Sequence, residues 1–169
     1  ESLFGILDVF WVGKLGAAAV AAVGLTEAIL VLIFAVAIGL SLSVTAMVAR
    51  RIGEKDPEAA AATAVQAIGL GLLVALPTGV VGIAYAPELL MLMGAPADVA
   101  KGGAVYTAWI LGGNVTILLL FLINAIFRGA GDASVAMRSL WLANGVNLVL
   151  DPCLIFGLGP FPELGVAGA

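Results

Sequence analysis

Long apolar runs with few charges constrain this chain more than any other feature of its sequence. The run LTEAILVLIFAVAIGLSLSVTAMV, over residues 25–48, holds a single carboxylate. A helix of about 20 such residues crosses the hydrocarbon core of a bilayer. Comparable runs lie at about 60–85, 103–127 and 139–158, and a shorter one lies at 2–12. We therefore predict an all-α fold, a polytopic bundle of transmembrane helices with four full spans and one partial span.

The composition agrees with a membrane protein and excludes several kinds of site. Hydrophobic residues make up 63% and charged residues 11% of the chain, whereas soluble proteins are about 45–50% apolar and 25% charged. The chain has no histidine, so it has no imidazole-ligated metal and no Ser-His-Asp triad. A net charge of −4, spread over the loops, provides no basic patch for nucleic acid. We predict no enzymatic activity, no cofactor and no nucleic-acid partner.

The positive charges orient the predicted bundle. Five of the seven Lys and Arg residues fall in or beside two short loops, at Arg50, Arg51, Lys55, Arg128 and Arg138. Short loops rich in Lys and Arg remain on the cytoplasmic side of a membrane. We therefore predict that the loops Arg50–Pro57 and Arg128–Arg138 are cytoplasmic.

The apolar run ANGVNLVLDPCLIFG, residues 143–157, carries three polar side chains on one stripe of its helix. Asn144, Asn147 and Asp151 follow one another at i, i+3 and i+7, positions that share a helix face. A charged side chain at the centre of a membrane helix costs roughly 2.5–3.5 kcal/mol on insertion scales, and such a residue usually faces a partner or a water-filled cavity. The stripe is therefore a candidate functional site.

Asp8 provides a second carboxylate at a similar depth. It lies six residues before Lys14, and Asp151 lies six residues before Gly157. At 1.5 Å per residue, both carboxylates are about 9 Å inside the outer ends of their helices. Such a pair can take up and release a proton or coordinate Na⁺, with the two asparagines of the stripe adding amide oxygens. Alternatively, each Asp hydrogen-bonds neighbouring groups and holds helices together. We predict an ion-coupling site here, and no metal site other than this possible Na⁺ site.

Three further side chains are candidates for the lining of a substrate cavity. Asn114 is near the middle of the span 103–127, where an amide either lines a cavity or bonds a neighbouring helix. Trp109 and Trp141 could face a drug-sized pocket, although tryptophans of membrane helices also serve in packing and in the interfacial belt.

Three blocks of the sequence together resemble the multidrug and toxic compound extrusion (MATE) family. They are DVFWVGKLGAAAVAAVGL at 8–25, FRGAGDASVAM at 127–137 and NLVLDPCLIFGLGPFPELGVAGA at 147–169, and their order and spacing match across the whole chain. The resemblance implies twelve helices in two six-helix lobes. Residues 1–169 would then be the N-terminal lobe, from part of helix one to helix five. We expect a piece of a longer protein, with its own C-terminal lobe as a partner.

The resemblance also implies a function. Asp8 matches an acidic residue of helix one in this family, and Asn147 and Asp151 match an Asn and an Asp of helix five, whereas Asn144 rests on the stripe alone. Both carboxylates together are similar to the branch called DinF, in which H⁺ or Na⁺ at the N-terminal lobe is thought to drive export. The implied protein is an antiporter of the prokaryotic cell (inner) membrane, surrounded by lipid, that exports apolar or cationic small molecules.

Two other functions are alternatives. A lipid-linked precursor flippase of the same superfamily needs a cationic cavity, and no Lys or Arg falls inside a predicted span. An intramembrane aspartyl protease also uses two membrane Asp residues, and GAGD at 129–132 has the G-x-G-D form. Its Asp132, however, is in a predicted loop, not at the depth of Asp8 or Asp151, so the two could not share one water.

Overall fold

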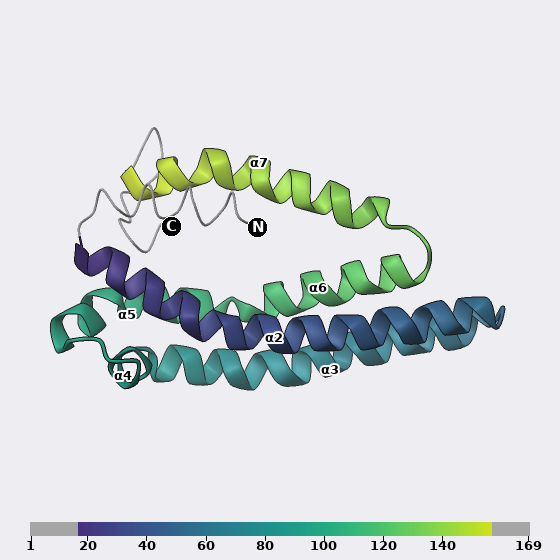
Figure 1. Cartoon of the computed structure of the whole chain (residues 1–169), viewed down its shortest axis with the longest axis horizontal. Helices are drawn as coiled ribbons and strands as arrows, with labels where there is room; N and C mark the ends of the chain where they lie inside the picture. Colours follow the sequence, from purple (N-terminus) through teal and green to yellow (C-terminus); the bar gives the residue numbers. More distant parts are fainter. Residues whose placement is uncertain (1–16, 157–169) are drawn as a thin grey trace. The chain divides into compact units, whose positions relative to one another are not determined.

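The computed structural model describes residues 17–156. Within the last helix, it leaves out the side chains of Ala136, Asn144, Asn147, Leu148, Asp151, Pro152, Ile155 and Phe156. The described chain is built of six helices (Figure 1): α2 (Ala17–Gly53), α3 (Pro57–Ala84), α4 (Ala86–Leu92), α5 (Ala97–Gly112), α6 (Asn114–Gly129) and α7 (Ser134–Phe156). The prediction of an all-α fold is confirmed.

Three described stretches are long and apolar enough to cross a membrane. They are Ala17–Gly53, Pro57–Ala84 and Ala97–Gly129. The predicted span 25–48 lies inside α2, and the predicted span 60–85 coincides with α3 apart from its ends. Helix α7 contains the first part of the span 139–158, while the segment 2–12 lies outside the described residues.

The span expected at 103–127 is interrupted. Helix α5 ends at Gly112, Gly113 has φ −79° and ψ 0°, and α6 begins at Asn114. The amide of Thr116 donates to the carbonyl of Gly113 at 2.9 Å, three residues back instead of four. Two adjacent glycines weaken a helix because each loses more backbone freedom on folding than other residues do. The sequence pattern had predicted one continuous helix here.

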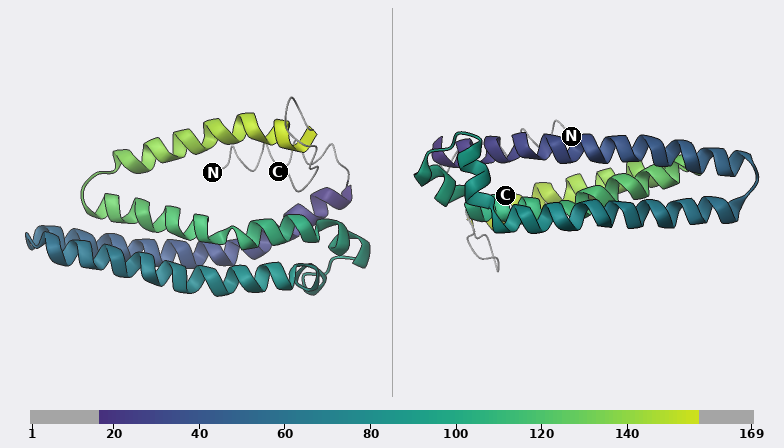
Figure 2. Two further views of the ribbon diagram at one scale, coloured as in Figure 1. Left: turned by 180° about the vertical axis from the view of Figure 1, so that it is seen from behind. Right: turned by 90° about the horizontal axis from the view of Figure 1, so that it is seen from below.

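The described chain divides into two compact units. One consists of residues 17–29, 81–111 and 141–156, and the other of 30–80 and 112–140. In the second unit, α2 and α3 form an antiparallel hairpin, and α6 packs against both (Figures 1 and 2). Its core includes Val44, Val48 and Leu122 in one cluster and Ala37, Ala75 and Leu118 in another.

The turn between α2 and α3 has local signals that stop one helix and start the next. Lys55 has a left-handed φ of 59°, and the carboxylate of Asp56 accepts the backbone N–H of Ala59 at 2.9 Å. Pro57 is the first residue of α3, where a missing N–H costs nothing. An Asp cap followed by Pro therefore begins α3 and closes the hairpin.

The first unit includes the start of α2, the short helix α4 and most of α5, together with the end of α3 and part of α7. Leu90 of α4 is fully buried among Ala95 and Ala100, and Val23 of α2 packs against Tyr106 of α5. Gly103 lies so close to the Cβ of Ala22 that a side chain at position 103 would collide with it. Small residues thus let α2 and α5 approach closely, as is common between membrane helices.

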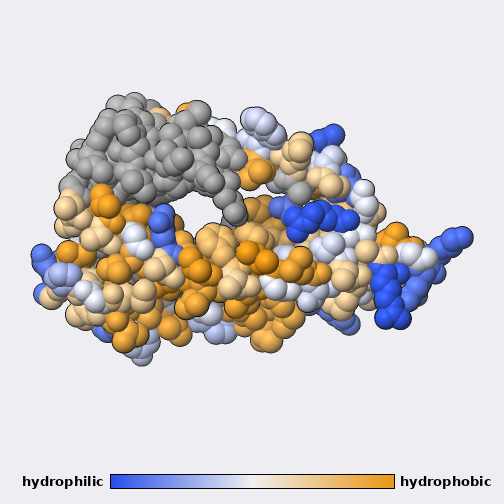
Figure 3. Space-filling model, viewed as in Figure 1, coloured by the Kyte–Doolittle hydropathy of each residue, from blue (hydrophilic) through white to orange (hydrophobic). Residues whose placement is uncertain are grey.

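Much of the described surface is apolar. Leu32 and Leu73, for example, expose 69% and 70% of their surface, and Figure 3 shows hydrophobic residues along α2 and α3 with hydrophilic residues at the turn that joins them. Large contiguous apolar surfaces mark contacts with membrane or protein. This surface suits helices that contact lipid or other apolar surfaces.

Candidate functional site

The predicted polar stripe lies on a single helix. Residues 144, 147 and 151 all belong to α7, so their backbone positions have the helical spacing that the stripe requires. The side chains of Asn144, Asn147 and Asp151 lie outside the described part of the structure, and so does the whole of Asp8. The pairing of Asp8 with Asp151, and any Na⁺ or H⁺ site there, therefore stays a prediction.

The turn before α7 is held by a carboxylate. Asp132 accepts hydrogen bonds from the backbone N–H of Ser134 at 3.1 Å and from its hydroxyl at 2.6 Å. These donors, together with the charge of Arg138, lower the pKa of Asp132 from its ordinary value. Asp132 is thus an exposed, charged carboxylate that holds the turn just before α7. An aspartyl protease needs a carboxylate that shares a proton with a partner, so this role speaks against the G-x-G-D alternative.

Asn114 forms a bond between two helices. Its side chain is fully buried, and its Nδ2 donates to Oγ1 of Thr78 in α3 at 2.9 Å. This is one of the two roles that the sequence left open. Thr78 itself was not expected, because a threonine in an apolar helix commonly bonds only the carbonyl four residues before it.

The two candidate tryptophans are largely exposed. Trp109 of α5 exposes 73% of its surface and Trp141 of α7 exposes 75%. Trp141 also borders an open groove of about 470 Å³ along α7, together with Gly145, Val146 and Val149. Side chains in this state are free to meet lipid, a substrate or another part of the protein. Their role in a substrate cavity stays a prediction.

A buried pair of threonines was missed by sequence reasoning. The hydroxyls of Thr26 in α2 and Thr107 in α5 are 2.8 Å apart, and neither residue has any exposed surface. Each hydroxyl also lies within hydrogen-bond distance of a carbonyl of its own helix, that of Ala22 at 2.8 Å and that of Gly103 at 3.1 Å. The sequence shows a threonine hydroxyl in each of two apolar runs, but it does not reveal that these hydroxyls lie in contact.

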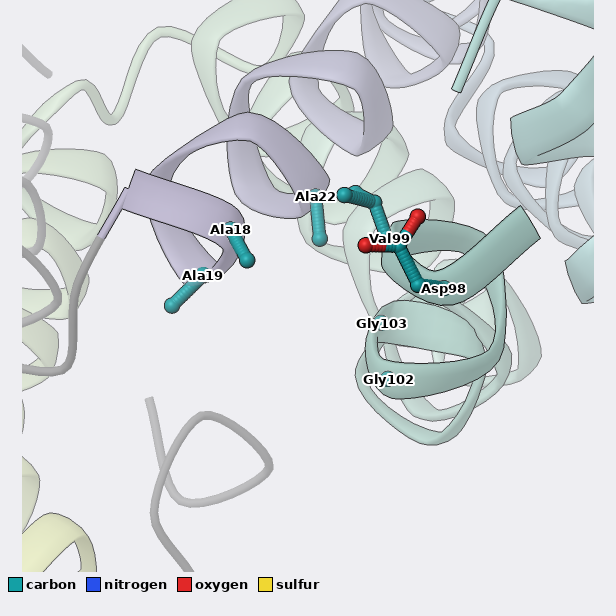
Figure 4. A pocket seen from close by; sticks show the side chains of 7 residues that line it. All are labelled: Ala18, Ala19, Ala22, Asp98, Val99, Gly102 and Gly103. Atoms are coloured by element: carbon teal, nitrogen blue, oxygen red, sulfur yellow. The ribbon is translucent and has the colours of Figure 1, made fainter. Parts of the chain in front are cut away.

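The described structure also has a small pocket beside the first turns of α2 and α5 (Figure 4). It has a volume of about 140 Å³, and its described lining is Ala18, Ala19, Ala22, Asp98, Val99, Gly102 and Gly103. Asp98 contributes the one carboxylate among these residues and is exposed. The pocket is too small for a drug-sized compound, because ligand pockets of that kind measure about 300–1,000 Å³.

Comparison with known proteins relates this helical arrangement to a family. The sequence matches the MatE family over residues 1–153. An FAD transporter of Shewanella oneidensis is 31% identical over 98% of this chain and 37% of its own length. The probable multidrug resistance protein NorM of Thermotoga maritima is 30% identical over 100% of this chain and 36% of its own length.

Solved structures agree with the sequence comparison. The inward-facing structure of a multidrug resistance MATE family transporter of the MOP superfamily has a TM-score of 0.89 to this chain at 35% identity. The match covers 99% of this chain and 37% of that one, so the chain spans little more than a third of the length of the relatives it matches. From its sequence and its fold, the chain belongs to the MatE family of multidrug and toxic compound extrusion transporters.

Proposed function

We propose that the protein containing this chain exports apolar, often cationic, small molecules across the prokaryotic cell membrane in exchange for H⁺ or Na⁺. The observation that carries the proposal is the match to the MatE family over residues 1–153. Relatives named as multidrug resistance or export proteins match over nearly the whole chain, including NorM of Thermotoga maritima and MepA of Staphylococcus aureus. The remaining lobe of the transporter would complete the path of the substrate.

The coupling ion would act at Asp8 and Asp151. Protonation or Na⁺ binding there changes the net charge between helices and so changes the relative stability of inward-facing and outward-facing states. An ion can shift that equilibrium only by the difference between its affinities for the two states, and the linkage is reciprocal with the substrate. The helical backbone of α7 supports the proposal because it gives Asn147 and Asp151 the spacing of one face.

The test is transport by the full-length protein in proteoliposomes, with a proton gradient and a Na⁺ gradient imposed separately. We expect Asp8→Asn and Asp151→Asn each to lower ion-driven export at least about tenfold, as for an intramembrane carboxylate that binds the coupling ion. Asp98→Asn is the matched control, because Asp98 is an exposed carboxylate of the small pocket. Undiminished export by both variants would show that these carboxylates are structural.

A second candidate substrate class comes from the FAD transporter of Shewanella oneidensis, which is 31% identical to this chain. FAD is an anionic dinucleotide, so a site that binds it needs hydrogen-bond donors or positive charge. A site for cationic drugs needs neither. The same proteoliposomes distinguish the two candidates. Export of FAD that a cationic dye does not inhibit would favour the flavin nucleotide, and export of the dye alone would favour multidrug export.

A further inference from the structure

Two irregularities of the helices lie next to each other in the unit of residues 30–80 and 112–140. Pro77, inside α3, has no N–H to donate to the carbonyl of Leu73, four residues before it. Gly113 separates α5 from α6, and the amide of Thr116 closes a tight three-residue turn on its carbonyl. A tight turn within a helix often marks a hinge or a strained segment.

One hydrogen bond joins the two places. Asn114, the first residue of α6, donates from Nδ2 to Oγ1 of Thr78, the residue after Pro77. The single hydrogen of the Thr78 hydroxyl is used by its own helix, where the carbonyls of Val74 and Ala75 lie at 2.9 and 3.0 Å. Thr78 can therefore only accept from Asn114. This requirement fixes the amide with its oxygen, Oδ1, turned away from Thr78.

The amide oxygen is left without a donor. Asn114 has no exposed surface, and its Oδ1 has no hydrogen-bond partner among the described residues. A buried amide oxygen loses its hydrogen bonds to water, and the loss is uncompensated unless a donor replaces them. An arrangement in which Oδ1 regains a donor therefore recovers a hydrogen bond that the closed arrangement lacks.

We propose that Asn114 is a gated hydration site within the apolar lobe. The helix opens at Gly113, and a water molecule then donates to Oδ1 of Asn114. Water is the ligand that fits, because a lipid chain has no donor and a larger group cannot reach an amide that the chain encloses completely. The bond between Asn114 and Thr78 is the latch that holds the gate closed.

A hollow in the surface of the described chain borders the latch. Thr78 is exposed and lines a hollow of about 130 Å³ together with Val74 and Leu118. The lining of the hollow is apolar apart from Thr78, so a water that reaches the latch finds its hydrogen-bond partners at Thr78 and Asn114. Leu118 is one turn after Asn114 on α6, which brings the hollow close to the latch.

The experiment is amide hydrogen exchange of the full-length transporter in lipid nanodiscs, read over residues 114–118. Asn114→Leu keeps the branched shape of the side chain and removes the group that water would hydrate. This substitution removes the latch as well. In the wild type, however, opening replaces that single bond by water at both ends of the amide, whereas Leu gains no hydration when the helix opens. We therefore expect Asn114→Leu to slow exchange at these amides about threefold or more. Thr78→Val removes the latch and should speed exchange at the same amides by a similar factor.

Opposite signs for the two variants separate a gate from a merely structural bond. If the bond only stabilised the fold, both variants would speed exchange, and the proposal would be overturned. Thr63→Val is the matched control on α3, because the Thr63 hydroxyl donates only to its own helix, to the carbonyl of Ala59. Thr78→Ser keeps the hydroxyl, so its amide exchange rate should equal that of the wild type. Should Asn114→Leu not fold, an unchanged rate in Thr78→Val would by itself refute the gate.

Discussion

Among single residues, Gly129 sets how closely α6 can approach α2. A Cβ at this position would lie 2.8 Å from the carbonyl oxygen of Thr45 and 2.9 Å from Cβ of Val48. A backbone carbonyl cannot rotate away as a flexible side chain can, so the two helices would have to separate. The nearby hydrogen bond from the Thr45 hydroxyl to the carbonyl of Ala125, at 3.2 Å, would be strained by that movement.

We therefore expect Gly129→Ala to destabilise the protein by about 1–3 kcal/mol, the usual cost of inserting a methyl group into a packed interior. The measurement is the free energy of unfolding, or the melting temperature, of the full-length protein in detergent. Gly39→Ala in α2 is the control, since a Cβ there meets nothing within 4 Å. Equal stability of the two variants would contradict close packing at Gly129.

The hydroxyls of Thr26 and Thr107 should be energetically coupled. Because both are buried and 2.8 Å apart, we expect Thr26→Val and Thr107→Val each to cost about 0.5–1.5 kcal/mol, the range for one hydrogen bond. Either hydroxyl left alone can still donate to its own helix, so the double variant should cost less than the sum. A double-mutant cycle on unfolding should give a coupling of roughly 0.5 kcal/mol or more. Strict additivity would mean that the two hydroxyls do not interact.

At the level of helices and turns, the end of α2 carries two exposed ion pairs that share the carboxylate of Glu54. Arg50 Nε donates to one carboxylate oxygen at 2.8 Å and Arg51 Nη1 to the other at 3.0 Å. These bonds lower the pKa of Glu54 from its ordinary value of 4.5. A lowered pKa means that the folded turn favours the charged form, so its contribution is fully present above pH 4.5 and is lost as the pH falls through the lowered value.

We expect protection of the amides of residues 50–58 to fall when the pH is lowered from about 6 to about 3 in wild type. Glu54→Gln, which cannot titrate at this position, should start with weaker protection and show a smaller pH-dependent loss; the carboxylate of Asp56, which caps α3, remains in both proteins. The measurement is hydrogen exchange corrected for the intrinsic effect of pH on the chemical exchange rate. The side chain of Arg50 is 76% exposed, so the effect should also shrink at high salt. A wild-type response that Glu54→Gln reproduces would assign the loss to another group.

The positions of most described helices could be predicted from hydropathy alone, because lipid demands long apolar helices wherever the chain crosses it. The span 25–48 lies within α2, but the pattern underestimated the helix, which continues to Gly53 through Arg50 and Arg51. Helices often extend beyond the lipid once their backbone hydrogen bonds are established. The break at Gly113 was missed because hydropathy does not report a local change of backbone geometry.

The candidate site shows a different limit of sequence reasoning. The helical periodicity of residues 144–151 could be predicted from the sequence, because it requires only that α7 is a helix. Contacts between helices could not be predicted from the sequence. Asn114 could be assigned two roles, and only its packing against α3 revealed Thr78 as its partner. A sequence specifies which side chains are polar, but the register between two helices depends on many small contacts such as Gly71 against Leu122.

For the molecule as a whole, the charges gather at one end of the unit of residues 30–80 and 112–140. Gly129, at the end of α6, lies against Thr45 and Val48, near the end of α2. The loop that follows α6 therefore lies toward the same end of this unit as the turn that follows α2. These are the two loops that hold or adjoin Arg50, Arg51, Lys55, Arg128 and Arg138, which is the distribution expected for a cytoplasmic face.

This arrangement predicts the orientation of the transporter in the membrane. In the full-length protein, with Cys153 and any other native cysteine replaced, Lys55→Cys should resist a membrane-impermeant maleimide in intact cells and react after permeabilisation. Lys101→Cys, in the first turns of α5, should react in intact cells, because α3 carries the chain from the turn at Lys55 across the membrane. The two cysteines serve as controls for each other. Labelling of Lys55→Cys in intact cells would reverse the orientation and place the positive loops outside, against the charge rule.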